Sequence, residues 1–128
     1  MNAKPFPDTV AKGAHVIDIH EADSIDQTEF FHPKRAYAIP LRCLIPVGSV
    51  NLLTAGRSLS ADGPGFGSAR VMATCMAMGQ GAGTAAALCV RHGWSISEID
   101  TTLLHTTLID QGAIVDLDDL AVTVTTLH

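Results

Sequence analysis

Two arginines flank a glycine-rich stretch in the middle of the chain. Arg57 directly follows a glycine, and Arg70 lies where a helix is expected to begin, with residues 58–67 (SLSADGPGFG) between them. A helix start presents unpaired backbone N–H groups and the positive end of the helix dipole, which together suit an anionic or electron-rich ligand atom. Because a cation at this position opposes the dipole, Arg70 is expected to have a specific partner. Both arginines are candidates for binding an anionic ligand or a protein carboxylate.

The glycine pattern itself matches known phosphate-binding loops only in part. Residues 65–70 (GFGSAR) begin like a dinucleotide fingerprint, but Arg70 stands where the third glycine belongs. No acidic residue follows about 20 residues later at the end of a strand, as that fingerprint requires. The Gly-Lys-Ser/Thr sequence of a nucleotide triphosphate loop is absent as well. The loop therefore predicts either a ligand site or a plain structural turn.

Two further side chains have types that suit proton transfer or substrate binding. His20, close to Asp18, is a candidate proton donor, with a hydrogen-bonded structural histidine as the alternative. Arg42, in an apolar segment shortly after a proline, is a candidate ligand for a substrate carboxylate or, equally, for a structural carboxylate. The three cysteines are widely spaced, so we expect neither a disulfide framework nor a metal site, and we infer a cytoplasmic setting.

The strands that would hold these residues are short. Apolar patterns predict strands at 15–20 and 37–45, the second interrupted by Pro40, with polar loop between them. A compact apolar strand is predicted at 50–55, directly before Gly56. Strand 50–55, the glycine-rich loop and the following helix thus form a strand–loop–helix unit.

Two helices are predicted in the second half of the chain. The first is a long helix near 68–92, with Ser68 as its N-cap and Gly93 in the position of a C-terminal glycine. The second lies near 97–111, where Ser95 and Glu98 fit a capping box and Asp100 is a further cap.

The long helix contains 20 consecutive residues, 71–90, without a charge. About 20 apolar residues suffice to span a bilayer, but three glycines and several polar residues interrupt this stretch. The pattern favours a helix buried on all sides in a large protein. Glycine inside a helix costs about 0.5–1 kcal/mol relative to alanine. Gly79, Gly81 and Gly83 therefore indicate that a neighbour approaches the helix backbone closely.

The chain is poor in charged residues, and the uncharged stretch 71–90 accounts for part of this deficit. The chain has 128 residues, enough for one domain, but only 16% of them are charged against a usual value of about 25%. Eight cations against 13 carboxylates supply no broad basic face, which excludes a dedicated nucleic-acid binder. Disordered chains are rich in charge and poor in apolar residues, so disorder is excluded too.

Five blocks of sequence resemble, in their order and spacing, the C-terminal segment of a family of flavin-dependent oxidoreductases within the glutathione-reductase-like FAD superfamily. The blocks are 39–46 (IPLRCLIP), 51–57 (NLLTAGR), 67–72 (GSARVM), 74–76 (TCM) and 79–83 (GQGAG). Residues 18–20 (DIH) and the segment that ends in 110–112 (DQG) are similar too, so the resemblance covers about 15–113.

The resemblance implies an α/β (or α+β) chain that forms a partial FAD-binding fold, with FAD as cofactor and hydride transfer as chemistry. It implies that Gly56 and Arg57 run beside the ribityl and phosphate part of the cofactor. It also implies that the helix N-terminus faces the flavin pyrimidine edge. The residues that it places there are Gly67, Ser68, Arg70, Val71 and Met72.

The chain departs from the family pattern in ways that suggest an incomplete protein. It has no N-terminal βαβ unit with a full GxGxxG, the unit that holds the ADP half of FAD in this superfamily. Residues 62–66 (DGPGF) stand where a polar stretch with histidine is expected, which places a catalytic role for this loop in doubt. We therefore expect little activity and weak or absent FAD binding from the chain alone.

These observations predict one unit, 1–128, that is the C-terminal part of a larger flavoprotein. Residues 1–49 would lie on the substrate side, 50–92 would face the flavin, and 93–128 would form a C-terminal helix and tail. The expected partner is the remainder of the flavoprotein or a second copy of the chain, not nucleic acid or membrane. Two alternatives stay open: a non-catalytic, self-associating module and a small membrane-anchored protein.

Overall fold

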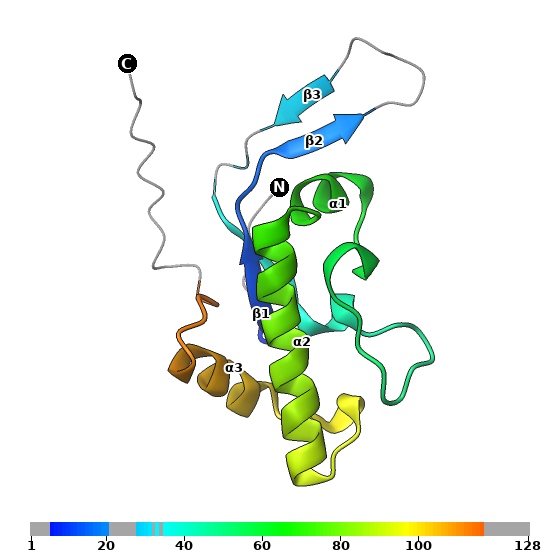
Figure 1. The fold of residues 1–128 in the computed structure, drawn as a ribbon, viewed down its shortest axis with the longest axis vertical. Helices are drawn as coiled ribbons and strands as arrows, with labels where there is room; N and C mark the ends of the chain where they lie inside the picture. The colour runs from blue at the N-terminus through cyan, green and yellow to red at the C-terminus, as the bar shows by residue number, and fades with distance from the viewer. Residues whose placement is uncertain (1–5, 21–27, 32, 34, 117–128) are drawn as a thin grey trace.

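A computed structural model describes residues 6–20, 28–31, 33 and 35–116 (Figure 1). The end of the predicted tail, 117–128, and most of the polar segment between the first two predicted strands lie outside these residues. Residues 28–31 of that segment form a strand, so the loop predicted there is wrong at these positions. The elements, in chain order, are β1 (Thr9–Gly13), β2 (Ile17–His20), β3 (Thr28–Phe31), β4 (Tyr37–Pro40), the 3₁₀ turns η1 (Leu41–Leu44) and η2 (Gly56–Ser58), α1 (Gly63–Ala69), α2 (Met72–His92), η3 (Ile96–Glu98) and α3 (Thr101–Asp110). This mixture confirms the predicted α/β or α+β class.

Two small antiparallel sheets hold the first part of the chain. β1 pairs with β4, with Gly13 opposite Tyr37, and β2 pairs with β3 in a separate hairpin that projects from one end of the molecule (Figure 1). The strand predicted at 37–45 ends at Pro40, which becomes the N-cap of η1. Proline has no N–H for a sheet ladder, so a strand ends readily there.

The strand predicted at 50–55 is wrong: these residues are irregular. The amide of Thr54 donates to the carbonyl of Leu44 at 2.8 Å, but no ladder follows from this bond. An extended apolar segment becomes a strand only where a neighbour pairs with its backbone groups. Within the described residues this segment has no such neighbour, and Val50 and Leu52 are exposed.

The glycine-rich stretch folds into a helix of its own, which moves the start of the long helix. Asp62 caps α1 by accepting a hydrogen bond of 2.8 Å from the amide of Gly65. After α1, Val71 adopts an extended conformation and α2 begins at Met72. Ser68 is therefore inside α1, and its predicted role as N-cap of the long helix is wrong.

The remaining helix boundaries follow the predicted signals. α2 ends at Gly93, whose φ of 69° is left-handed, and Arg91 lies in its last turn. Ser95 and Glu98 form the predicted capping box. Asp100 caps α3 through the amides of Thr102 and Leu103, which confirms the second helix over 101–110. Its start was predicted too early, because the box at Ser95 and Glu98 belongs to the separate turn η3.

The hydrophobic core lies between α2 and the elements behind it. Its largest fully buried side chains are Leu44, Met78, Leu104, Leu108 and Val10. Gly81 is the place where α2 meets β1, because a Cβ there would lie 2.8 Å from the Cβ of Val10 and 2.9 Å from its carbonyl oxygen. The close backbone approach that the glycines indicate is thus confirmed at one of them.

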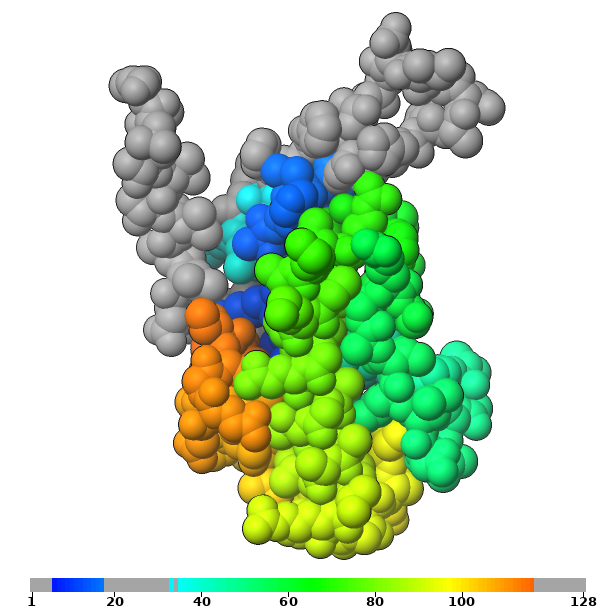
Figure 2. All heavy atoms as spheres, viewed as in Figure 1, coloured from blue at the N-terminus to red at the C-terminus, as the bar shows by residue number. Residues whose placement is uncertain are grey.

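The opposite face of α2 is uncovered, contrary to the predicted burial on all sides. We call this face the outer stripe; it comprises Met72, Met76, Gly79, Gly83, Ala86 and Val90. Met76 is 76% exposed and Val90 is 86% exposed. A Cβ at Gly79 or Gly83 would meet no atom within 4 Å. Figure 2 shows α2 running bare along the front of the molecule, from green to yellow.

Candidate functional site

The residues predicted to bind the cofactor come together around the start of α2. Gly67 and Ser68 belong to the end of α1, and Arg70, Val71 and Met72 form the junction with α2. The second group, Gly56 and Arg57, begins η2, which packs against both α1 and α2. A Cβ on Gly56 would lie 3.6 Å from the Sγ of Cys75 in the first turns of α2, so the two groups are neighbours in space.

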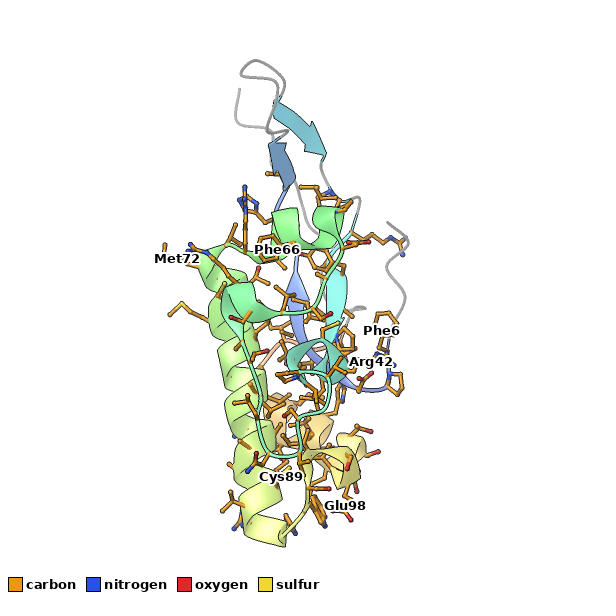
Figure 3. The ribbon with its side chains drawn as sticks, turned by 90° about the vertical axis from the view of Figure 1, so that its right-hand side faces the viewer. Phe6, Arg42, Phe66, Met72, Cys89 and Glu98 are labelled. Atoms are coloured by element: carbon orange, nitrogen blue, oxygen red, sulfur yellow. The ribbon has the colours of Figure 1, made fainter. Side chains whose placement is uncertain are left out.

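The start of α2 lacks the usual satisfaction of its backbone donors. Val71 occupies the N-cap position, no side chain caps it, and no acidic residue lies in the first turn. The first hydrogen bond of the helix runs from the amide of Cys75 to the carbonyl of Val71, at 2.9 Å. The N–H groups before Cys75 and the positive dipole end therefore remain directed at whatever lies ahead of the helix. Met72 is 79% exposed there and points away from the rest of the molecule (Figure 3).

The two arginines at this site differ in their surroundings. Arg57 is exposed, and no side chain in the described part of the chain forms an ion pair with it. Arg70 is half-buried and has an interaction partner of its own. Arg57 is therefore the cation that is best placed to meet an anionic ligand.

Ser68 has a structural task that the sequence did not reveal. It is fully buried, its Oγ donates to the carbonyl of His15 at 2.5 Å, and it accepts a hydrogen bond of 2.7 Å from the phenol of Tyr37. Burial raises the pKa of Tyr37, an effect that the hydrogen bond to Ser68 opposes, so the phenol stays protonated and donates. A Cβ on Gly13 would overlap the Tyr37 ring, so a glycine is needed across the sheet. These contacts tie α1 to the sheet.

Arg42 is held by the carboxylate of Asp8, the residue directly before β1. Its Nη2 lies 3.0 Å from Asp8 Oδ1, and its backbone amide donates to Asp8 Oδ2 at 3.3 Å. Its guanidinium carbon lies 4.8 Å from the centre of the Phe6 ring, and the two side chains lie together on the side of the molecule away from α2 (Figure 3). The guanidinium nevertheless stays accessible, since the side chain is 57% exposed.

A cavity of about 390 Å³ opens beside Arg42. It is bounded by β4, η1 and residues 59–62, and it reaches Gly65 and Ala69 of α1. Cys43 is part of its wall, and burial raises the pKa of this thiol, with Arg42 opposing that effect and Asp8 adding to it. The thiol is therefore protonated near neutral pH and is no ready nucleophile.

His20 and Arg42 lie on different elements: His20 is in the β2–β3 hairpin, and Arg42 is in η1, directly after β4. His20 is the last residue of β2 and pairs with Thr28 of β3. Its side chain lies outside the described part of the structure, but β2 packs against α1, so the strand runs beside the helix that leads to α2. Its role as a proton donor stays a prediction.

Sequence reasoning missed the residues that support the site from a distance. Tyr37 lies in a segment that was predicted only as a strand, and no role was predicted for Asp8. Their partners lie 31 and 34 residues away in the chain, beyond the reach of local patterns. The one signal available was glycine at position 13, because a glycine within a strand often marks a close approach.

The described residues contain neither a metal-binding cluster nor a membrane-spanning helix. No group of three histidine, cysteine or acidic side chains there is arranged to hold a metal ion. Likewise, no helix in the described ranges combines the length and apolar character needed to cross a membrane.

Comparison with known proteins identifies the family of the chain. Searches of curated proteins and of solved structures each found no match. A family model described as FAD dependent oxidoreductase matches residues 1–108. This range includes all of α2 and every candidate site residue, from His20 to Met72. The chain therefore belongs to the FAD dependent oxidoreductase family.

Proposed function

We propose that this chain is the flavin-facing, C-terminal part of an FAD-dependent oxidoreductase, with α2 directing its N-terminus at the flavin ring. The observation that carries the proposal is the uncapped start of α2, which the family match and the surrounding candidate residues accompany. In most helices a side chain such as Ser, Thr or Asp satisfies these donors. A helix that is otherwise well capped but open at this end suits a ligand with electron-rich atoms.

The donor set at this junction fits the cofactor. The N–H groups of the first turn of α2, at residues 72–74, suit the carbonyl and ring nitrogen of a flavin pyrimidine edge, and the exposed Arg57 suits a phosphate. Gly56 has a φ of 68°, which brings the backbone around in a left-handed turn beside α2. When bound, FAD supplies the capacity to exchange a hydride with a substrate.

The chain's own residues then have assigned tasks. The start of α2 would favour negative charge at the flavin pyrimidine edge, Arg57 would hold the phosphate part, His20 would supply a proton, and Arg42 would bind a substrate carboxylate. Ser68 and Tyr37 keep α1, and with it the junction before Met72, in place.

The outer stripe of α2 is the contact surface for the remainder of the flavoprotein. A cavity of about 680 Å³ continues the stripe between Gly83, Val90 and the irregular residues 50–53. Large exposed apolar patches mark interaction surfaces on soluble proteins. Because this surface is open, the chain alone has little activity and binds FAD weakly or not at all.

The cofactor assignment is tested by titrating the ¹⁵N-labelled chain with millimolar FMN and following its amide resonances. We expect weak, saturable shifts at residues 56–57 and 70–74. Arg57→Gln weakens them, and Arg91→Gln, at the other end of α2, does not. Shifts confined to other residues, or no shifts, would contradict the assignment. Purification of the chain with stoichiometric flavin would contradict the proposed incompleteness.

A second candidate, a self-associating module, is favoured by the spacing of the outer stripe. Its positions recur at intervals of four and three residues, the pattern by which two helices pair, and its glycines permit close approach. Sedimentation at increasing concentration would show a dimer that Val90→Lys dissociates and Val47→Lys, at an exposed valine away from α2, leaves intact. A monomer at every concentration removes this candidate.

A further inference from the structure

The cavity beside Arg42 has the size and lining of a small-molecule site. Its volume of about 390 Å³ falls within the 300–1,000 Å³ that is common for ligand pockets. Tyr37, Ile39 and Leu59 supply apolar wall, and Arg42 is the cationic side chain in its described lining. A ligand that fills it needs an apolar body and a group that an arginine binds.

The acidic side chain in this lining is already engaged. Asp62 Oδ1 accepts a hydrogen bond of 2.8 Å from the amide of Gly65, which is the cap of α1. Its charge is therefore directed at the start of that helix, where it is favourable. Arg42 is left as the charged group that can select a ligand.

The pairing of Arg42 with Asp8 is incomplete in a way that leaves room for a second carboxylate. The two side chains approach to 3.0 Å, yet Asp8 Oδ1 is buried and receives no hydrogen bond of good geometry from any described residue. Arg42 has five N–H donors in a planar fork that matches a carboxylate with two parallel bonds. With its side chain 57% exposed, it has donors to offer beyond Asp8.

The cavity also leads to the flavin-facing junction. Its lining includes Gly65 and Ala69 of α1, and Ala69 directly precedes Arg70. A molecule held in this cavity would therefore lie against α1, the helix that leads to the start of α2. This position is what a substrate pocket requires, if the proposed function holds.

Resting on that proposed function, we propose that this cavity binds the substrate, and that the substrate class is a small monocarboxylic acid with an apolar body. The carboxylate lies against Arg42 in competition with Asp8, and the apolar body lies along Tyr37, Ile39 and Leu59.

The test uses the flavin-free chain. The ¹⁵N-labelled protein is titrated with acetate, 3-methylbutyrate and 3-phenylpropionate, and with 3-phenylpropionamide as the uncharged counterpart. We expect saturable shifts at residues 37–43 and 59–69, affinity that rises with the apolar body, and binding of the amide at least about tenfold weaker, as loss of a charge-assisted hydrogen bond implies.

Three variants test whether Arg42 binds the carboxylate and whether Asp8 competes for it. Arg42→Gln lowers the affinity for 3-phenylpropionate at least about tenfold, and Arg42→Lys, which keeps the charge but not the fork, falls between. Asp8→Asn removes the competing carboxylate and raises the affinity, whereas a purely structural pair would lose binding from either side. Arg91→Gln serves as the charge-matched control and binds as the unchanged chain does.

Four outcomes would overturn the proposal, and none of them bears on the FMN titration. Equal binding of acid and amide, undiminished binding by Arg42→Gln, shifts outside the cavity, or no saturable shift with any acid overturns the proposal. Thermal melting of each variant confirms that it is folded; if Asp8→Asn unfolds, the pair of Arg42 variants decides. Because flavin is absent, failure here leaves the FMN titration standing, and failure of that titration leaves carboxylate binding standing.

Discussion

The two faces of α2 are built from similar residues but have opposite surroundings. On the inner face Met78 is fully buried and Gly81 lies against β1. On the outer stripe Met76 is 76% exposed and Gly83 has open space beside it. Neither face carries a charge, so the difference is not one of composition. The described part of the chain covers only the inner face, and our proposal assigns the outer stripe to a second partner.

The sharpest way to break this comparison is to truncate one methionine on each face. Met78→Ala leaves a cavity in the core and should lower the free energy of unfolding by about 2–5 kcal/mol. Met76→Ala should change it by no more than about 0.5 kcal/mol, because the side chain is exposed. Urea denaturation at low protein concentration measures both. Similar losses in the two variants would mean that the outer stripe is covered in solution.

The two glycines provide a second matched pair with opposite signs. Gly81→Ala places a Cβ 2.8 Å from Val10 Cβ and 2.9 Å from its carbonyl, so the backbone must move. Overpacking costs about 1–3 kcal/mol, less the gain of up to about 1 kcal/mol from replacing a helical glycine. Gly83→Ala has no clash and should stabilise by about 0.5–1 kcal/mol. Stabilisation by both alanines, seen in the same urea titrations, would refute the close approach to β1.

How far the sequence predicted the molecule follows the range of the interactions. Gly93, the Ser95–Glu98 box and the Asp100 cap act within a few residues, and all were predicted correctly. The start of α2 was misplaced because Asp62 caps a separate helix, and the strand at 50–55 was predicted from apolar pattern without a partner to pair with. The Tyr37–Ser68 tie joins residues 31 apart, so only the fold reveals it.

The two ends of α2 extend the comparison from stability to function. Its C-terminus has a glycine cap, whereas Val71 at its N-terminus already has the backbone conformation of an N-cap, with φ −76° and ψ 151°, but no capping side chain. Val71→Ser should therefore stabilise the chain by about 0.5–1 kcal/mol. The same hydroxyl would occupy donors that the flavin needs, so it should weaken the FMN-induced shifts at 70–74. Thermal melts and the FMN titration, run on one sample, measure both. Stabilisation with undiminished shifts would show that these donors do not face the cofactor.

The smallest effect concerns the well-capped region after α2, where pH alters one hydrogen-bonded carboxylate. Glu98 accepts from the hydroxyl of Ser95 at 2.7 Å and from its amide at 2.9 Å, and these bonds lower the pKa of Glu98 below its ordinary value of 4.5. A lowered folded-state pKa means that the contribution is present above 4.5 and is lost as the pH falls through the lower, folded value. Glu98→Gln should therefore show a flatter decline of the melting temperature on acidification, with Asp110→Asn, at the end of α3, as the control. Since Glu98 is exposed, the effect is small and is confined to this acidic window. If Glu98→Gln removes most of the change in melting temperature on acidification, the capping box also affects the packing of α2 against α3, and not only the turn between them.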